Sequence, residues 1–346
     1  MSKRLSFGLV GCGDFGKELG RYILEVADIA ALCDVNVASA AKTAAALSLD
    51  VPVHDDVRRM INAGGLDAIA VTAANFAHAE IAIAAADKGL HVFCEKIMAP
   101  TVAECLRMIE ACGRGGVKLM IGHKRRLRPS WARMIELTRP EGPLGEALAI
   151  TIAQYADMRP YRYPGTWWAD ARRGGGSLAV LCPHVLDWSS AMCGRATSVS
   201  AHYGPRMNDG YGYPDILHAT WRFDSGALAT VNSSFEYPLH RYRQAQGPLV
   251  QCRNGAIKLV PDMQQIDLYW QRLDESEMRH ERFSVSDDFP PAYRCEIGDF
   301  VKWVIEDRPP CLTWREGLHC VEMMEAAYRS AERDGTPVAI SDAAVQ

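Results

Sequence analysis

Three glycines near the start of the chain have a spacing that suits the binding of phosphate groups. Gly11, Gly13 and Gly16 follow the apolar run Leu5–Val10 and match the pattern G-x-G-x-x-G. Apolar residues then recur at helical spacing over 19–26, so the sequence predicts a strand, a glycine turn and a helix in that order. Free backbone N–H groups and the positive end of the helix dipole would face an anion bound at this turn.

An acidic residue stands where the ribose of a dinucleotide would lie. Asp34 ends the next apolar run, "IAALCD", about twenty residues after the glycines, and can accept hydrogen bonds from a ribose diol. Its charge would repel a 2′-phosphate, and Val35 and Asn36 offer no cation to neutralise one. The sequence therefore favours NAD over NADP, with a glycine turn that binds nothing as the alternative.

The alternation of segments in the first third of the chain predicts a doubly wound parallel sheet. Strand-like and helix-like segments alternate over residues 1–122. One of the helices opens with a capping box, because Thr101 and Glu104 stand three residues apart. We therefore expect a Rossmann dinucleotide-binding domain over 1–122.

A change of pattern after residue 122 predicts a second domain. Long strand-like runs are separated by turn signals at 224–226 and 254–255, which favours a mainly antiparallel, open-faced sheet. Amphipathic helices return at 296–307 and after a second capping box, Thr313 with Glu316. The fold class expected is α/β, with an α+β domain for substrate binding and oligomerisation over 123–346. Its C-terminal helices could pack back on the Rossmann domain.

Composition excludes several classes of partner. A net charge of −4 over 346 residues gives no general attraction to nucleic acid or to an anionic membrane, and no apolar run is long enough to span a bilayer. The 11 cysteines include no C-x-x-C pair, so we expect reduced, mostly buried thiols and no metal. The N-terminus runs directly into the first strand and leaves no room for a signal peptide, which favours a cytoplasmic location.

Motifs over nearly the whole chain resemble the glucose–fructose oxidoreductase/inositol dehydrogenase/rhizopine-catabolism (Gfo/Idh/MocA) family. In the first domain the matching residues are Asn75, His78, Glu95 and Lys96. In the second they are Arg126, Pro129, Gly174, Gly175, Gly176, His184 and Asp187. The resemblance implies an NAD(P)-dependent dehydrogenase of a sugar, a sugar derivative or inositol.

The resemblance also implies two catalytic residues, Lys96 beside the reacting carbinol and His184 assisting proton transfer. Oxidation of a secondary alcohol needs a hydride acceptor and a base, and a partly desolvated lysine beside a nicotinamide cation gives up its own proton readily. The alternatives are a solvated lysine at residue 96 and a hydrogen-bonded core histidine at residue 184.

The remaining candidate site residues follow from the glycine turn, the family motifs and the composition of 154–176. Those expected at the cofactor are Gly11, Gly13, Asp14, Phe15, Gly16, Asp34, Val35, Thr72, Ala73, Asn75, His78, Glu95, Lys96, Arg126 and Trp167. Those expected at the substrate are Lys96, Arg126, Tyr155, Asp157, Arg162, Tyr163, Trp168, His184 and Asp187. An ordinary surface loop is the alternative for 154–176. His240, Arg241 and Arg243 are further candidates for binding an acidic sugar group.

Three residues depart from the family pattern. Val180 stands where many members carry an acid four residues before the histidine, so either Lys96 and His184 suffice or another acid such as Asp187, Asp157 or Asp170 takes its place. Ile97 replaces a proline whose preceding bond is often cis, and we expect a trans bond because a non-proline cis bond costs about 3 kcal/mol. Ala73 and Ala74 replace a Thr-Pro pair beneath the nicotinamide.

Two other functions stay open from the sequence. One is glycoside cleavage through transient oxidation at C3 with tightly held NAD, and the other is a non-catalytic NAD-binding sensor or regulatory protein. Relatives often pair through the open face of the second sheet, so the resemblance also implies a homodimer or homotetramer.

Overall fold

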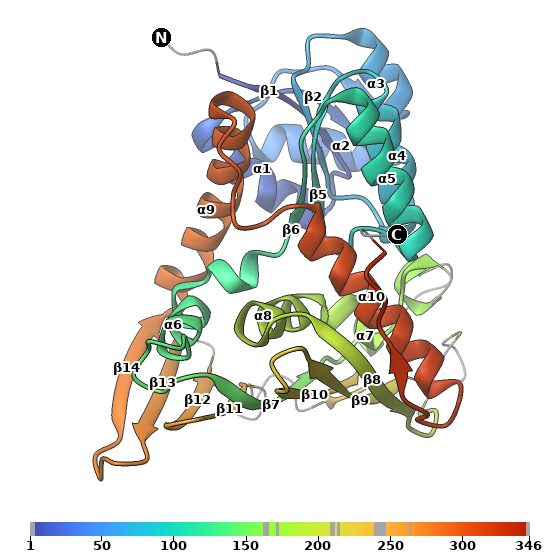
Figure 1. Cartoon of the computed structure of the whole chain (residues 1–346). Coiled ribbons are helices and arrows are strands. Elements are labelled where there is room, and N and C mark those ends of the chain that lie inside the picture. The colour runs from blue at the N-terminus through green and yellow to red at the C-terminus, as the bar shows by residue number, and fades with distance from the viewer. Residues whose placement is uncertain are drawn as a thin grey trace. The chain divides into compact units, whose positions relative to one another are not determined.

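The structure is a computed structural model of the chain (Figure 1) and describes residues 4–161, 166–170, 173–207, 212, 215–238, 247–262 and 264–343. The chain divides into two compact units. The first comprises Met1–His123 and Tyr293–Leu318, and the second comprises Lys124–Ala292 and His319–Gln346. Across the described residues, every helix is too short or too polar to traverse a lipid bilayer.

The described part of the first unit contains a six-stranded parallel sheet in the order β3-β2-β1-β4-β5-β6. Its strands are β1 (Ser6–Val10), β2 (Asp28–Cys33), β3 (Val53–His54), β4 (Ala68–Val71), β5 (His91–Glu95) and β6 (Leu119–Gly122). The strand order reverses between β1 and β4, where ligands bind in doubly wound sheets. The predicted Rossmann fold is confirmed.

The helices of this unit begin where the sequence places caps and turns. They include α1 (Asp14–Val26), α2 (Val37–Ala46), α3 (Val57–Ala63), α4 (His78–Ala86) and α5 (Val102–Gly115), and α4 and α5 lie side by side (Figure 1). The capping box of α5 forms as expected: Glu104 N–H donates to Thr101 Oγ1 at 3.2 Å, and Thr101 N–H donates to Glu104 Oε2 at 3.1 Å.

A late segment of the chain completes the core of the first unit. Within α9 (Val285–Glu306), Tyr293 stacks on Tyr22 of α1 with ring centroids 4.8 Å apart. Further along the same helix, the ring centroid of Phe300 lies 5.9 Å from that of Phe7 in β1. The apolar face predicted for 296–307 is therefore the face that covers β1.

The described part of the second unit contains a nine-stranded sheet in the order β14-β13-β12-β11-β7-β10-β9-β8-β15. The strands are β7 (Ala147–Tyr155), β8 (Ala196–Tyr203), β9 (Ile216–Phe223), β10 (Leu228–Ser234), β11 (Leu249–Cys252), β12 (Gly255–Pro261), β13 (Gln265–Arg272), β14 (Arg279–Ser284) and β15 (Val338–Ala339). The pairing is antiparallel except between β7 and β10, and the predicted turns at 224–226 and 254–255 join β9 to β10 and β11 to β12.

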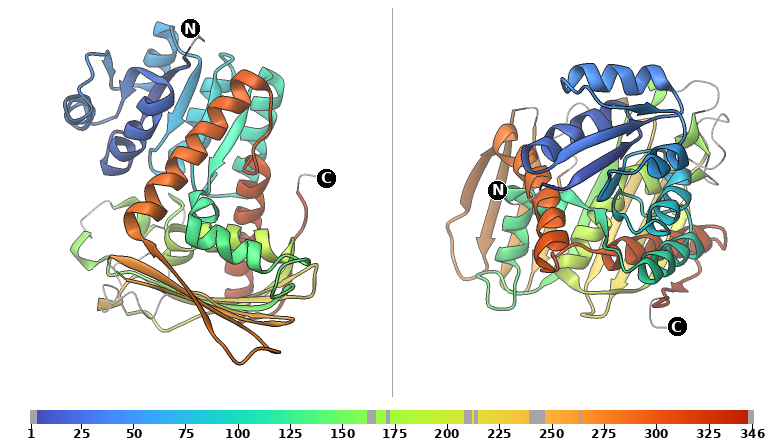
Figure 2. Two further views of the ribbon diagram at one scale, coloured as in Figure 1. Left: turned by 90° about the vertical axis from the view of Figure 1, so that its left-hand side faces the viewer. Right: turned by 90° about the horizontal axis from the view of Figure 1, so that it is seen from above.

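Helices of the second unit cover one face of this sheet: α6 (Pro129–Leu137), α7 (Ser177–Leu181), α8 (Pro183–Cys193) and most of α10 (Trp314–Ala331) (Figure 2). Trp221 of β9 is fully buried on this face and donates from Nε1 to the carbonyl of Met323 in α10 at 3.3 Å. Trp188 of α8 packs edge-on against Trp131 of α6. Because residues alternate between faces along a strand, this packing leaves the alternate residues on the outer face.

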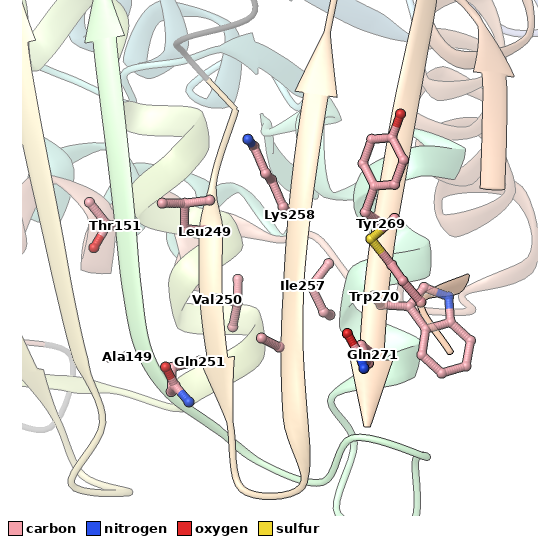
Figure 3. A pocket seen from close by; sticks show the side chains of 12 residues that line it. Ala149, Thr151, Leu249, Val250, Gln251, Ile257, Lys258, Tyr269, Trp270 and Gln271 are labelled. Carbon is pink, nitrogen blue, oxygen red and sulfur yellow. The ribbon is translucent and has the colours of Figure 1, made fainter. Parts of the chain in front are cut away.

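The outer face of the sheet carries a shallow depression of about 680 Å³. Figure 3 shows side chains that line it, including Thr151 of β7, Leu249 of β11, Lys258 of β12 and Tyr269 of β13. Leu249 is 47% exposed there. The prediction of a mainly antiparallel, open-faced sheet is confirmed.

Candidate active site

The glycine turn between β1 and α1 is shaped for close approach of a ligand to the backbone. A Cβ on Gly16 would lie 1.9 Å from the carbonyl oxygen of Gly11, and one on Gly11, whose φ is +93°, would lie 2.5 Å from Ala73 N. A Cβ on Gly13 would meet nothing within 4 Å and would fill the space at the start of α1. Gly11 and Gly16 thus serve packing, whereas Gly13 keeps open the space that a pyrophosphate requires.

Asp34 is fixed beside this turn by two backbone contacts. Its Oδ2 accepts from Cys12 N–H at 2.7 Å, and its Oδ1 accepts from Asn36 N–H at 2.8 Å. A carboxylate oxygen has more than one acceptor site, so each can still accept from a ribose hydroxyl. Val35 is 93% exposed next to it. These residues fit a dinucleotide whose adenosine ribose carries no 2′-phosphate.

Side chains tie the loop after β4 to the glycine turn and to Ile97, the residue after Lys96. Thr72 donates from Oγ1 to the carbonyl of Gly11 at 2.5 Å. His78 is 1% exposed, and its ring nitrogens lie 2.9 Å from the carbonyl oxygen of Ala73 and 2.7 Å from that of Ile97. The structure therefore gives the imidazole of His78 a role in joining two loops at the sheet edge.

The burial of His78 predicts an acid-dependent loss of stability. Burial lowers the pKa of His78 below its ordinary value of 6.5, and the contacts with the two carbonyl groups only partly oppose this. At a pH below 6.5 the imidazole is protonated in the unfolded chain but stays neutral in the folded chain. The free energy of unfolding therefore keeps its full contribution from His78 above pH 6.5 and loses it as the pH falls below that value. Thermal unfolding is measured at roughly pH 7.5 and at roughly pH 5.5, and the Tm of the native chain should fall more between the two than the Tm of His78→Asn. An equal decrease in both would contradict this role.

The prediction for the bond after Lys96 is wrong, because the Lys96–Ile97 peptide is cis. The prediction weighed only the intrinsic preference of a non-proline bond. Ile97, Met98 and Ala99 are buried, and the carbonyl of Ile97 contacts the ring of His78, so tertiary packing sets the path of this segment. Lys96 itself follows β5 directly and is half-buried at the carboxyl edge of the sheet.

In the second unit, His184 lies on a helical stripe of α8 together with Asp187. α7 ends at Leu181 and α8 begins at Pro183, with a bend at Cys182 between the two helices. His184 and Asp187 are spaced i and i+3 on α8 and share one side of that helix. His184 is 8% exposed.

A buried ion pair forms one end of this stripe. Arg126 lies in a short 3₁₀ helix, η2 (Lys124–Leu127), and donates from Nε to Asp187 Oδ2 at 2.7 Å, while its Nη2 contacts Oδ1. The Asp187 side chain is fully buried and that of Arg126 is 14% exposed. The pair anchors η2 to α8 one turn after His184, so each partner orients the other.

Val180 lies on α7 and has apolar surroundings. Val180 packs against Trp168 and Phe235, together with Met158 and Leu181. Of the acids expected to replace the missing carboxylate, Asp187 is engaged by Arg126, and Asp157 forms two bonds of 2.8 Å with Arg159. Asp170 stays a prediction.

The candidate substrate residues on 154–176 are only partly described. Trp168 is buried and Trp167 is half-buried. The ring centroids of Tyr155 and Tyr237 are 4.6 Å apart. Arg162 and Tyr163 lie outside the described residues, as do Arg172, His240, Arg241 and Arg243.

Two apolar residues of this region, Met158 and Phe235, were missed in the sequence analysis. Val231 and Ser233 of β10 point inward, and continuing their alternation to the residue directly after the strand would have placed Phe235 on the helix-covered face.

Comparison with known proteins decides the family. Residues 5–123 match the family described as "Oxidoreductase family, NAD-binding Rossmann fold", and residues 140–340 match its "C-terminal alpha/beta domain". The chain belongs to the Gfo/Idh/MocA oxidoreductase family. The family membership inferred from motifs is therefore confirmed, and with it an NAD-dependent oxidoreductase.

The proteins that this Gfo/Idh/MocA chain resembles include named enzymes. It is 34% identical to inositol 2-dehydrogenase 2 of Saccharopolyspora erythraea over 74% of each chain. It is 30% identical to 2,7-anhydro-N-acetylneuraminate hydratase of Escherichia coli K12 over 75% of this chain and 68% of that protein. Levoglucosan dehydrogenase in complex with NADH shares its fold, with a TM-score of 0.85 at 19% identity over 98% of this chain and 99% of that one.

Proposed function

We propose that this oxidoreductase transfers a hydride between a secondary alcohol of a sugar, sugar derivative or inositol and the nicotinamide of NAD. The observation that carries the proposal is the position of Lys96. It follows β5 at the same sheet edge as the glycine turn after β1, and one strand lies between them. Neighbouring strands are about 4.8 Å apart, so these strand ends are about 10 Å apart. A dinucleotide on the glycine turn can thus present its far end to the amine.

The residues of the first unit would hold the cofactor, and the bound nicotinamide would supply the hydride acceptor. Gly13 and the start of α1 would take the pyrophosphate, Asp34 the adenosine ribose, and the loops joined by His78 the nicotinamide end. The other cofactor candidates, such as Asp14, Phe15, Asn75, Glu95 and Trp167, are proposed to complete this site.

The proton of the substrate hydroxyl requires a base, which we assign to the neutral amine of Lys96. His184 would donate or accept at the same oxygen, held in place by the helical stripe that Arg126 and Asp187 anchor. Because Val180 lies in an apolar cluster, this chain would use the lysine and the imidazole without an acid at residue 180.

The test is a spectroscopic screen for NADH. Inositols, aldoses, uronic acids and glycosides are incubated with the protein and NAD⁺, and absorbance of the reduced cofactor is followed. Sustained NADH formation with one class supports the proposal. The relative named as a hydratase favours a second candidate, redox-neutral cleavage or hydration through transient oxidation. That candidate predicts substrate consumption without NADH accumulation.

We also propose a homodimer or homotetramer formed through the outer face of the nine-stranded sheet. The depression between Thr151 and Tyr269, with the exposed Leu249 in it, supports an apolar contact there (Figure 3). Light scattering should give the mass of two or four chains, and Leu249→Asp should lower it. We propose a cytoplasmic location as well. All 11 cysteines are free thiols, and thiols stay reduced in the cytoplasm.

A further inference from the structure

Two consecutive residues of α10 hold the two ends of α8, the helix that carries His184. The thiol of Cys320 donates to the carbonyl of Pro183, the first residue of α8, with 3.4 Å between sulfur and oxygen. The ring of His319 accepts at Nε2 from Ala196 N–H at 3.1 Å, shortly after the C-terminal end of the same helix. α10 therefore fixes α8 at both ends, and the first of these contacts is made by the residue directly before His184.

The carboxylate of Glu322 sets the orientation of the His319 ring. Because Nε2 accepts a hydrogen bond, the proton of the neutral imidazole lies on Nδ1, which donates to Glu322 Oε2 at 3.2 Å. Glu322 is 4% exposed, and Nη2 of Arg195 donates to the same oxygen. Burial raises the pKa of Glu322, but the hydrogen bonds that it accepts outweigh burial and hold that pKa below the ordinary value of 4.5. The carboxylate is therefore charged at neutral pH.

Three residues after β15, Ser341, Asp342 and Ala343 (the clasp), close this network. Ala343 N–H donates to the other carboxylate oxygen, Glu322 Oε1, at 2.8 Å. Arg195 donates from Nη2 to the carbonyl of Ser341 at 3.2 Å, and its Nε lies 3.6 Å from Asp342 Oδ2. The clasp therefore contacts both the carboxylate on α10 and the arginine that follows α8.

From these contacts we infer that Glu322 and the clasp are positioning residues for His184, because they fix the helix whose first turn presents the imidazole. This inference rests on the proposed function, since it concerns the proton transfer assigned to His184. A helix of 11 residues moves as a rigid element, so contacts at its ends set the position of His184. A displacement of about 1 Å in a reacting group can lower the rate by about 10²-fold.

The test uses two variants that weaken the network in different ways. Glu322→Gln removes the charge that binds Arg195. Ala343→Pro removes the N–H that donates to Glu322 and leaves every buried side chain in place. Each should lower kcat for sugar oxidation by about tenfold and leave KM for NAD⁺ within about twofold, because the proposed phosphate and ribose contacts lie in the first unit. Glu332→Gln, at an exposed glutamate directly after α10, is the matched control and should change neither.

Proton–carbon NMR of the histidine rings gives a readout that needs no turnover. The Cε1–Hε1 signal of His184, assigned by its loss in His184→Gln, should move in both variants. The signal of the exposed His218 in β9 should stay in place. If Glu322→Gln does not fold, Ala343→Pro decides the question alone.

The outcomes separate this inference from the proposed function. If no sugar yields NADH but the His184 signal moves, the proposed function fails and the inference holds. An unmoved His184 signal overturns the inference even where the Tm falls, because the clasp then serves stability alone. An unchanged kcat in a variant whose His184 signal moves would overturn it as well, while a sugar dehydrogenase stands.

Discussion

Replacing Lys96 with methionine is expected to lower kcat for alcohol oxidation by about 10²- to 10⁴-fold while NAD binding stays as in the native chain. Methionine retains the length of the side chain but removes the base, and a positioned proton acceptor contributes about this factor. Lys96→Arg should be equally inactive, because a guanidinium remains protonated and cannot accept the hydroxyl proton. Steady-state NADH formation and fluorescence titration with NADH measure the two quantities.

Lys88→Met supplies the control for this prediction. Lys88 is an exposed lysine just after α4, outside the proposed site, and its loss should change neither kcat nor cofactor binding. Full activity in Lys96→Met would contradict the role of the amine. Lost activity together with lost NADH binding would show that Lys96 holds the cofactor and is not the base.

Changing Asp187 to asparagine is expected to destabilise the protein by about 3–5 kcal/mol, the usual effect of removing one partner from a buried ion pair. The carboxylate is fully buried, and the guanidinium of Arg126 would keep its charge without its main partner. The substitution should also lower kcat, because η2 and α8 lose the contact that aligns them beside His184. Urea unfolding with a constant m-value gives the stability change.

An exposed ion pair provides the matched comparison. Arg253 lies 2.8 Å from Glu146, and both side chains are more than half exposed, so Glu146→Gln should cost less than about 1 kcal/mol. Replacing both buried partners, as in Arg126→Met with Asp187→Leu, should recover much of the lost stability but not the activity. If Asp187→Asn lowers the free energy of unfolding no more than Glu146→Gln does, the buried ion pair does not stabilise the contact between η2 and α8.

Residues whose effect is local explain why much of the fold could be predicted from the sequence. Gly11 and Gly16 need no distant contact to define a turn, and the capping box of Thr101 and Glu104 spans a single helical turn. The start of α9 shows the limit of such signals. Its helix begins at Val285 and contains Pro290 and Pro291, whereas the sequence signal begins near residue 296. Asp288, which binds the N–H of Ser130, secures this early turn through a contact far away in the chain.

The parts of the site that escaped the sequence analysis depend on tertiary contacts. The cis bond after Lys96 is set by buried neighbours and by the ring of His78, none of which a single-bond preference includes. Phe235 joins Val180 only because β10 and α7 meet in the folded chain, so the apolar surroundings of Val180 could not be inferred from its own segment. His184 and Asp187 were found because they match the motif of the family in the second domain.

The most direct test of the central claim is a crystal structure of the chain with NAD and a sugar that supports turnover. The account predicts that the Lys96 amine and the His184 imidazole both lie within hydrogen-bond reach of one substrate hydroxyl, whose carbon faces C4 of the nicotinamide. A Lys96 amine directed into bulk solvent, remote from the nicotinamide ring, would contradict the account.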